Sequence, residues 1–173
     1  MLSLASRISR TCHAACLAFD MRGSGSSKGW PTLTGSSEVS DVISAAAFLR
    51  GEFPRLSDKL FILGYSAGAC IGGSASPEVK PLGYIGIGYP CGVLASVAFS
   101  AHPARLLQFE GRKLFILGSS DFFTSESRLR LIFGSQNKTE IRILPNIGHF
   151  DILCSEKDLC DSISAFIQTA CLD

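Results

Sequence analysis

Residues 59–68, Lys-Leu-Phe-Ile-Leu-Gly-Tyr-Ser-Ala-Gly, join an apolar run to the pattern Gly-x-Ser-x-Gly. Residues 59–63 have the length and composition of a buried strand, and the small residues that follow can begin a helix. A serine on a strained turn between strand and helix needs small residues on both sides, and the turn holds its hydroxyl clear of the backbone. The stretch therefore predicts a nucleophile elbow with Ser66 at its tip.

Two further apolar runs end close to residues that could serve such a serine. Residues 113–117 are followed closely by Asp121, and residues 140–144 are followed closely by His149. Each run is typical of a buried strand, so both side chains are expected at strand ends, as Ser66 is. The resulting chain order of serine, aspartate and histidine differs from the orders in chymotrypsin-type and subtilisin-type proteases.

These three residue types can act as one chemical unit. A serine hydroxyl is a poor nucleophile near neutral pH, so a neutral imidazole must take its proton. Asp121 would orient the imidazole of His149 and stabilise its cation. Taken singly, a turn aspartate and a loop histidine are the simpler interpretations. The coincidence of three strand ends favours a catalytic triad. The other histidines, His13 and His102, lack this context, and we expect both on the surface.

A further stretch carries a resemblance to a known superfamily. Residues 16–27, Cys-Leu-Ala-Phe-Asp-Met-Arg-Gly-Ser-Gly-Ser-Ser, are similar to the fourth strand of α/β-hydrolases and the Asp-x-Arg-Gly-x-Gly-x-Ser loop after it. We assign that loop a structural role. The elbow and the triad order are also those of this superfamily. The chain beyond residue 10 thus resembles small, cap-poor serine hydrolases of the serine aminopeptidase and dienelactone hydrolase type.

The resemblance implies a mechanism and a substrate class. The chain is expected to be a serine hydrolase that cleaves an ester, thioester or amide through an acyl-enzyme on Ser66. His149 would act first as the general base and then as the acid, with Asp121 as its orienting partner. The amide of Ala67 would be an oxyanion-hole donor. The expected partner is a small-molecule acyl substrate.

The remaining sequence alternates helical and strand patterns. Residues 38–50 and 155–170 place apolar side chains at helical spacing, which predicts helices that pack against a sheet. Residues 83–88 are typical of another buried strand, whose glycines allow a helix or the active-site backbone to approach closely. Alternating units of this kind predict an α/β fold, a three-layer α/β/α sandwich with a mostly parallel sheet. We expect residues 1–173 to form a single, partial α/β-hydrolase domain.

That domain is expected to be truncated at its N-terminus. Members of the superfamily carry several strands before the one expected at residues 16–19, and this chain starts too late to hold them. The second oxyanion donor normally follows the third strand, so only the Ala67 amide would remain. Losing one donor typically lowers the rate by about 10²- to 10³-fold.

The late start also affects the sheet. In the family's strand order the third strand lies between the fourth and fifth, so the strand that carries Ser66 would have an open edge. Such an edge invites self-association or pairing with another chain, unless residues 16–19 move into the gap. The alternative function is therefore a truncated, catalytically weak or inert protein that binds a partner through this edge.

Two regions leave alternatives open. Residues 1–11 fit the end of a helix, but the basic, serine-rich and acid-free first 19 residues also resemble an organelle transit peptide. Residues 89–112 hold apolar side chains that either line an acyl pocket or pack a crossover helix against the sheet. These side chains are Val93, Leu94, Val97, Phe99, Leu106 and Leu107, and Cys91 could border the same pocket.

Composition excludes several other classes of protein. The chain has 173 residues, of which 46% are hydrophobic and 18% charged, and it contains no apolar segment long enough to span a membrane. A net charge of +1 with scattered basic residues argues against nucleic acid as a partner. Gly23-x-Gly25 is followed by Lys28, where a dinucleotide loop needs glycine, and no Walker-type motif occurs. We expect no cofactor.

Cysteine usage indicates the compartment. The chain has seven cysteines, an odd number, and no evident secretory signal. A reduced cytoplasmic or organellar setting therefore fits better than a disulfide scaffold. Cys12 and Cys16 form a lone pair without a matching second pair, which argues against a metal site.

Overall fold

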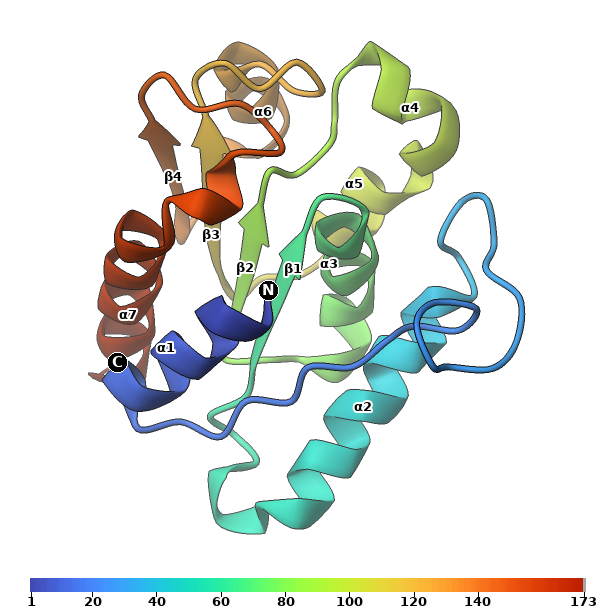
Figure 1. The fold of residues 1–173 in the computed structure, drawn as a ribbon, viewed down its shortest axis with the longest axis vertical. Coiled ribbons are helices and arrows are strands. Elements are labelled where there is room, and N and C mark those ends of the chain that lie inside the picture. Colours follow the sequence, from blue (N-terminus) through green and yellow to red (C-terminus); the bar gives the residue numbers. More distant parts are fainter. Residues whose placement is uncertain (173) are drawn as a thin grey trace.

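The computed structural model describes residues 1–172, apart from the side chains of Leu94 and Ser96. Its centre is a sheet of four parallel strands in the order β1-β2-β3-β4. Parallel strands need crossover connections, and helices supply them here (Figure 1). The strands are β1 (Phe61–Tyr65), β2 (Gly83–Ile87), β3 (Arg112–Gly118) and β4 (Thr139–Leu144).

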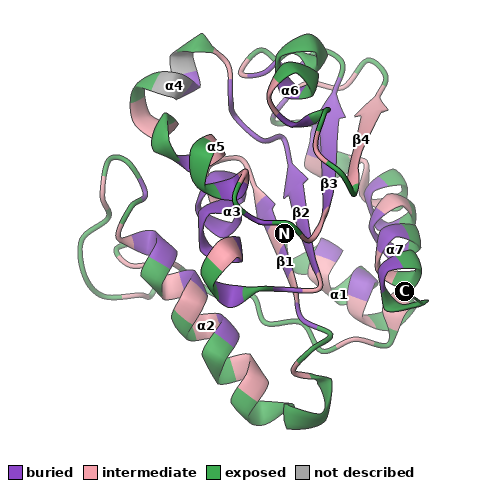
Figure 2. Ribbon diagram, turned by 180° about the vertical axis from the view of Figure 1, so that it is seen from behind, coloured by how far each residue is buried: buried purple, intermediate pink, exposed green. Residues whose placement is uncertain are grey.

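Helices cover both faces of this sheet. One core cluster joins it to α2 (Glu38–Glu52), α3 (Ala67–Val79), α5 (Ala101–Leu106) and α6 (Glu126–Phe133). A second cluster joins the opposite face to α1 (Leu2–Cys12) and α7 (Glu156–Leu172). The remaining elements are η1 (Pro54–Leu56), α4 (Val93–Phe99) and η2 (Ile152–Cys154). Figure 2 shows β2 and β3 largely buried between these layers, while β1 alternates between buried and intermediate residues, so the predicted three-layer α/β/α sandwich is confirmed.

The helix expected near the N-terminus is present and packs at the back of the sheet. Leu4 and Ile8 lie one helical turn apart and are buried in the cluster that includes α7. His13 ends α1 with a left-handed backbone, φ 51°, and its side chain is exposed as predicted. Within the described residues no helix is both long and apolar enough to cross a membrane. The seven cysteines are free.

The strand expected at residues 16–19 is not formed, and that prediction was wrong. These residues have no regular secondary structure, and Leu17 and Phe19 are 40% and 43% exposed. A strand needs a hydrogen-bonded neighbour, and an apolar run alone does not supply one. Among the described residues β1 pairs only with β2, so β1 is an edge strand. Self-association through this edge stays a prediction.

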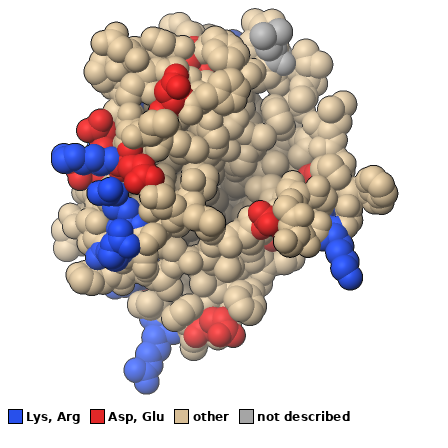
Figure 3. All heavy atoms as spheres, viewed as in Figure 1, with Lys and Arg blue, Asp and Glu red and all other residues tan. Residues whose placement is uncertain are grey.

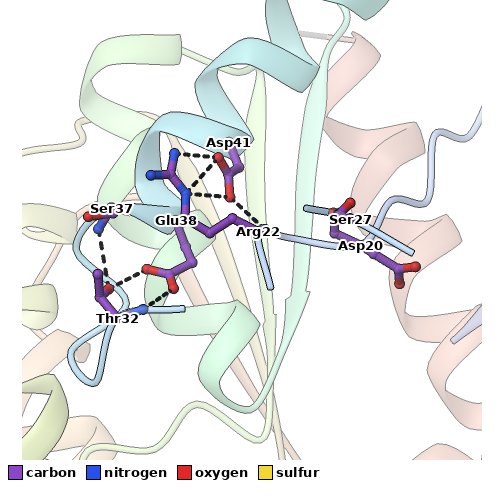
Figure 4. Close-up of polar contacts among 7 residues, drawn as sticks. All are labelled: Asp20, Arg22, Ser27, Thr32, Ser37, Glu38 and Asp41. Atoms are coloured by element: carbon purple, nitrogen blue, oxygen red, sulfur yellow. Dashed lines mark hydrogen bonds and ion pairs between the residues drawn. The ribbon is translucent and has the colours of Figure 1, made fainter. Parts of the chain in front are cut away.

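The loop before α2 is fixed by charged hydrogen bonds (Figure 4). The Arg22 guanidinium donates to Asp41 at 2.6 Å and 3.0 Å, and its backbone N–H donates to the same carboxylate at 2.9 Å. Thr32 donates both its backbone N–H and its hydroxyl to Glu38, which is only 4% exposed. Both carboxylates belong to the first turn of α2. The loop is therefore tied to that helix, in line with the structural role expected for it.

His102 is buried, so the expectation of a surface position was wrong. It lies in α5, is 4% exposed, and its Nδ1 accepts a hydrogen bond from the Ser74 hydroxyl at 2.6 Å. Its Nε2–H donates to the Thr34 carbonyl at 2.6 Å. The adjacent Pro103 misled the interpretation, because proline is tolerated in the first turn of a helix as well as in a loop. The imidazole links α3, α5 and the loop before α2.

Replacing Asp41 should reduce the acid sensitivity of the fold. The hydrogen bonds from Arg22 lower the pKa of Asp41. A carboxyl whose pKa is depressed on folding stabilises the protein above its unfolded pKa, about 4, and loses that effect as pH falls through the lower folded value. Urea unfolding between pH 7 and pH 3 should show a smaller drop in the free energy of unfolding for Asp41→Asn than for the wild type.

Asp161 offers a matched control for that experiment. It pairs with Lys157 at 2.9 Å on the surface of α7, where its side chain is 64% exposed. Exposed pairs of this kind contribute little to stability. Asp161→Asn should therefore follow the wild-type pH curve. Identical curves for all three proteins would show that the Arg22–Asp41 contact does not stabilise the fold.

Candidate active site

Ser66 lies on a tight turn between β1 and α3. Its backbone has φ 53° and ψ −126°, a conformation rare for residues other than glycine. At Gly64 a side chain would collide with the Gly68 carbonyl, so only glycine lets the helix leave the strand so abruptly. The Ser66 N–H donates to the carbonyl of Ile87 on β2 at 2.9 Å. The predicted strand–turn–helix geometry of the elbow is present.

The structure brings the three predicted residues together. The Ser66 Oγ lies 2.9 Å from Nε2 of His149, and Nδ1 of His149 lies 2.7 Å from Oδ2 of Asp121. The three side chains follow β1, β3 and β4, whose carboxyl ends meet at one edge of the parallel sheet. With its Nδ1 proton held by Asp121, a neutral His149 directs the lone pair of Nε2 toward the serine hydroxyl.

Both oxygens of the Asp121 carboxylate accept hydrogen bonds. Its Oδ1 accepts from the backbone N–H groups of Phe123 at 2.8 Å and Thr124 at 3.1 Å, while Oδ2 holds His149. The Asp121 and His149 side chains are 0% and 1% exposed. A buried carboxylate is costly unless it is paired in this way. The turn after β3 therefore fixes both the position of the charge and its direction toward the imidazole.

Aromatic rings surround the imidazole of His149. Tyr65 stacks on it with ring centroids 5.6 Å apart, and its hydroxyl donates to the His149 carbonyl at 3.1 Å. Phe123 and Phe150 meet it edge-on at 4.6 Å and 5.3 Å. Sequence reasoning missed these three residues, although each is a direct neighbour of a triad residue or follows Asp121 closely. They restrict the rotation of the imidazole.

Two pKa shifts describe the electrostatics near the site. Burial raises the pKa of the Tyr65 phenol, and the carboxylates of Asp121 and Asp151 raise it further. The phenol therefore stays protonated and remains a hydrogen-bond donor. Burial also raises the pKa of the Cys91 thiol, which keeps it from acting as a thiolate nucleophile near neutral pH.

Ala67 occupies the position expected of an oxyanion donor. As the first residue of α3, it presents an amide that has no acceptor within the helix and lies directly beside Ser66. The positive end of the helix dipole adds to its attraction for an anion. Among the described residues, no group of three or more His, Cys, Asp and Glu side chains is arranged to hold a metal ion.

Two exposed phenylalanines lie beside the imidazole of His149. Phe122 and Phe150 are 64% and 67% exposed, and their ring centroids lie 6.3 Å and 5.3 Å from that of His149. Figure 3 shows the basic side chains of this face at its left, lower and right margins, and acidic side chains both there and in its upper part.

Residues 89–112 contain side chains that line a pocket and side chains that pack against the sheet, which are the two roles considered for them. Phe99 lines a cavity beside Ser66, whereas Leu106 is buried in the core cluster. Cys91 is buried and is not one of the residues that line this cavity. The side chain of Leu94 lies outside the described residues. The connection therefore forms both a pocket and a packed crossover.

The fold is that of the α/β-hydrolases, as comparison with solved structures shows. An α/β serine hydrolase homologue from Coxiella burnetii matches 96% of this chain with a TM-score of 0.74 at 18% identity, over 75% of its own length. A serine hydrolase without a lid from Xanthomonas campestris matches 96% of this chain with a TM-score of 0.74 at 20% identity, over 73% of its length. An esterase from Pyrococcus furiosus matches 88% of this chain with a TM-score of 0.71 at 17% identity, over 69% of its length.

The likeness lies in structure and not in sequence. No protein-family model and no curated protein sequence matches the chain. At these identities the solved structures establish the α/β-hydrolase fold, and the chemistry has to be argued from the residues of this chain.

Replacing Gly88 should displace the imidazole of His149. Gly88 follows directly after β2 with φ 56°, and a Cβ there would lie 3.2 Å from Cε1 of His149. Gly88→Ala should lower the free energy of unfolding by about 1–2 kcal/mol through its left-handed backbone alone. It should also shift the His149 ring resonances in an NMR spectrum, because the imidazole has to move.

Gly29 separates the backbone effect from the contact. It also has a positive φ, 97°, but a Cβ there would meet only Arg22 at an ordinary 3.5 Å. Gly29→Ala should lose stability without moving the His149 resonances. Unchanged His149 resonances in Gly88→Ala would contradict the packing described here.

Proposed function

We propose that the chain is a serine hydrolase that cleaves an ester, thioester or amide through an acyl-enzyme on Ser66. The observation that carries this proposal is the continuous hydrogen-bonded chain from Ser66 through His149 to Asp121. The fold supports the proposal, because the similar structures are described as a serine hydrolase homologue, a serine hydrolase and an esterase. The amide of Ala67 is the oxyanion donor that we assign.

In the first half of the reaction, Ser66 Oγ attacks the carbonyl carbon of the substrate while Nε2 of His149 takes the hydroxyl proton. Asp121 stabilises the resulting imidazolium through Nδ1–H. The carbonyl oxygen becomes an oxyanion that the Ala67 amide stabilises. When the tetrahedral intermediate collapses, the bond to the leaving group breaks, and the leaving group takes the proton from Nε2.

The second half regenerates the enzyme. A water molecule enters the position of the leaving group and gives its proton to Nε2 of His149 as its oxygen attacks the acyl carbon. The ester bond to Ser66 Oγ then breaks, and His149 returns the proton to the serine. This step releases the free acid and regenerates the Ser66 hydroxyl, so atoms and charge balance without a cofactor.

A partner-binding protein without catalytic activity is the second candidate. The edge position of β1 favours it, because backbone groups on the outer side of an edge strand can pair with another chain. This candidate needs no reactive serine. Reactivity of Ser66 therefore separates the two functions.

A fluorophosphonate probe should label the wild type at Ser66. Labelling requires a serine whose proton is taken by a neighbouring base. Ser66→Ala and His149→Ala should therefore both lose it completely, while circular dichroism shows that they are folded. In-gel fluorescence and mass spectrometry of the labelled peptide provide the measurement.

Ser74 is a matched control, because it also donates a hydrogen bond to a histidine, His102, at 2.6 Å but is 0% exposed. Ser74→Ala should keep the labelling of the wild type. A folded wild type that the probe does not label would overturn the proposed hydrolase and favour the partner-binding candidate.

Asp121→Asn should lower kcat by about 10³- to 10⁴-fold, since the imidazole loses its anionic partner and its preferred tautomer. The measurement is the rate of ester hydrolysis at neutral pH. Asp151→Asn is the control, because Asp151 lies near the site but makes no hydrogen bond with His149. Its kcat should stay within a few-fold of the wild type. Equal effects of the two substitutions would remove Asp121 from the proposed mechanism.

A further inference from the structure

A cavity of about 240 Å³ opens beside Ser66. Apart from the serine, every described side chain that lines it is apolar, and none of them carries a charge. These residues are Pro90, Ala95, Ala98, Phe99 and Phe123. Among the described residues that line the cavity, Ser66 alone has a hydrogen-bonding side chain, so the cavity suits apolar groups that match its shape.

Helix α4 leaves this space open where it presents two alanines to the cavity. Ala95 and Ala98 are three residues apart and lie on the side of the helix that faces the cavity. Val93 and Val97 are each 86% exposed. The two valines thus point toward solvent, whereas the methyl groups of the two alanines line the cavity together with the ring of Phe99. A larger side chain at position 98 or 95 would occupy the cavity itself.

The arrangement of the triad decides which half of a substrate this cavity receives. The leaving group has to come within hydrogen-bond distance of Nε2 of His149, because it takes its proton there. His149 does not line the cavity, and the edge of the Phe123 ring lies against its imidazole at 4.6 Å between centroids. The cavity therefore opens beside the serine on a side where the acyl chain fits and the leaving group does not.

The volume limits the length of that acyl chain. At about 30 Å³ for each water-sized group, the cavity holds roughly eight such groups. A carbonyl and a straight chain of about six carbons fill it. We propose that the cavity binds the acyl chain of short, uncharged fatty acyl esters and that Ala98 and Ala95 set the maximum chain length, an inference that rests on the proposed function.

The test is a series of p-nitrophenyl esters of increasing acyl length: acetate, butyrate, hexanoate and dodecanoate. The wild type should have its highest kcat/KM for butyrate or hexanoate, with a loss of at least tenfold for dodecanoate. Ala98→Leu places an isobutyl group where a methyl group lines the cavity. A misfit of one methylene group in such a pocket lowers kcat/KM by about tenfold or more. The ratio of hexanoate to acetate activity of Ala98→Leu should therefore fall by at least about tenfold. Ala95→Val should act in the same direction.

Val97→Leu is the matched control, because it enlarges the same helix on its exposed side. Its chain-length profile should equal that of the wild type. The acyl-chain site would be overturned if Ala98→Leu and Ala95→Val slowed the hydrolysis of all esters equally. It would also be overturned if the wild type preferred dodecanoate. Either result would leave the proposed hydrolase function intact. A folded wild type that hydrolyses none of the esters and is not labelled by the fluorophosphonate would instead remove the proposed function, and this inference with it.

Discussion

The turn at Ser66 is the constraint on which the rest of the site depends. Its left-handed backbone costs on the order of 1–3 kcal/mol and persists only because the surrounding structure holds it. Strand β1 on one side and the buried helix α3 on the other provide that support, and the contact of Gly64 with the Gly68 backbone brings them close. Once this turn is set, the hydroxyl points away from the core, toward the edge of the sheet where β3 and β4 also end.

The chain holds two hydrogen-bonded serine–histidine pairs with different surroundings. Ser66 is partly exposed, and the far nitrogen of its partner His149 is bound to a carboxylate. Ser74 is fully buried, and the far nitrogen of His102 is bound to the carbonyl of Thr34. A nucleophile needs access to a substrate and a base whose cation is stabilised. The first pair meets both needs, whereas the second joins three segments of the fold. Geometry within a pair is therefore not enough to assign chemistry.

Much of the site could be predicted because its signals are local. The elbow, the strand ends and the three triad residues each follow from short apolar runs and the turn residues after them. The strand at residues 16–19 could not be judged in this way, because strand formation depends on a neighbour distant in the chain. The same holds for His102, whose burial depends on α3 and on the loop before α2. The cavity beside Ser66 depends on the orientation of α4, which no local pattern reveals.

The packing of α1 on α7 has a consequence for biosynthesis. Leu4 and Ile8 lie near the start of the chain, yet the cluster that buries them includes Leu159, Ile163 and Phe166 near its end. A ribosome releases the N-terminal segment first, so this helix emerges long before the residues that cover it. The part of its apolar side that α7 covers stays accessible to water and to chaperones until α7 is made. The layer formed by α1 and α7 is therefore complete only after α7 has left the ribosome.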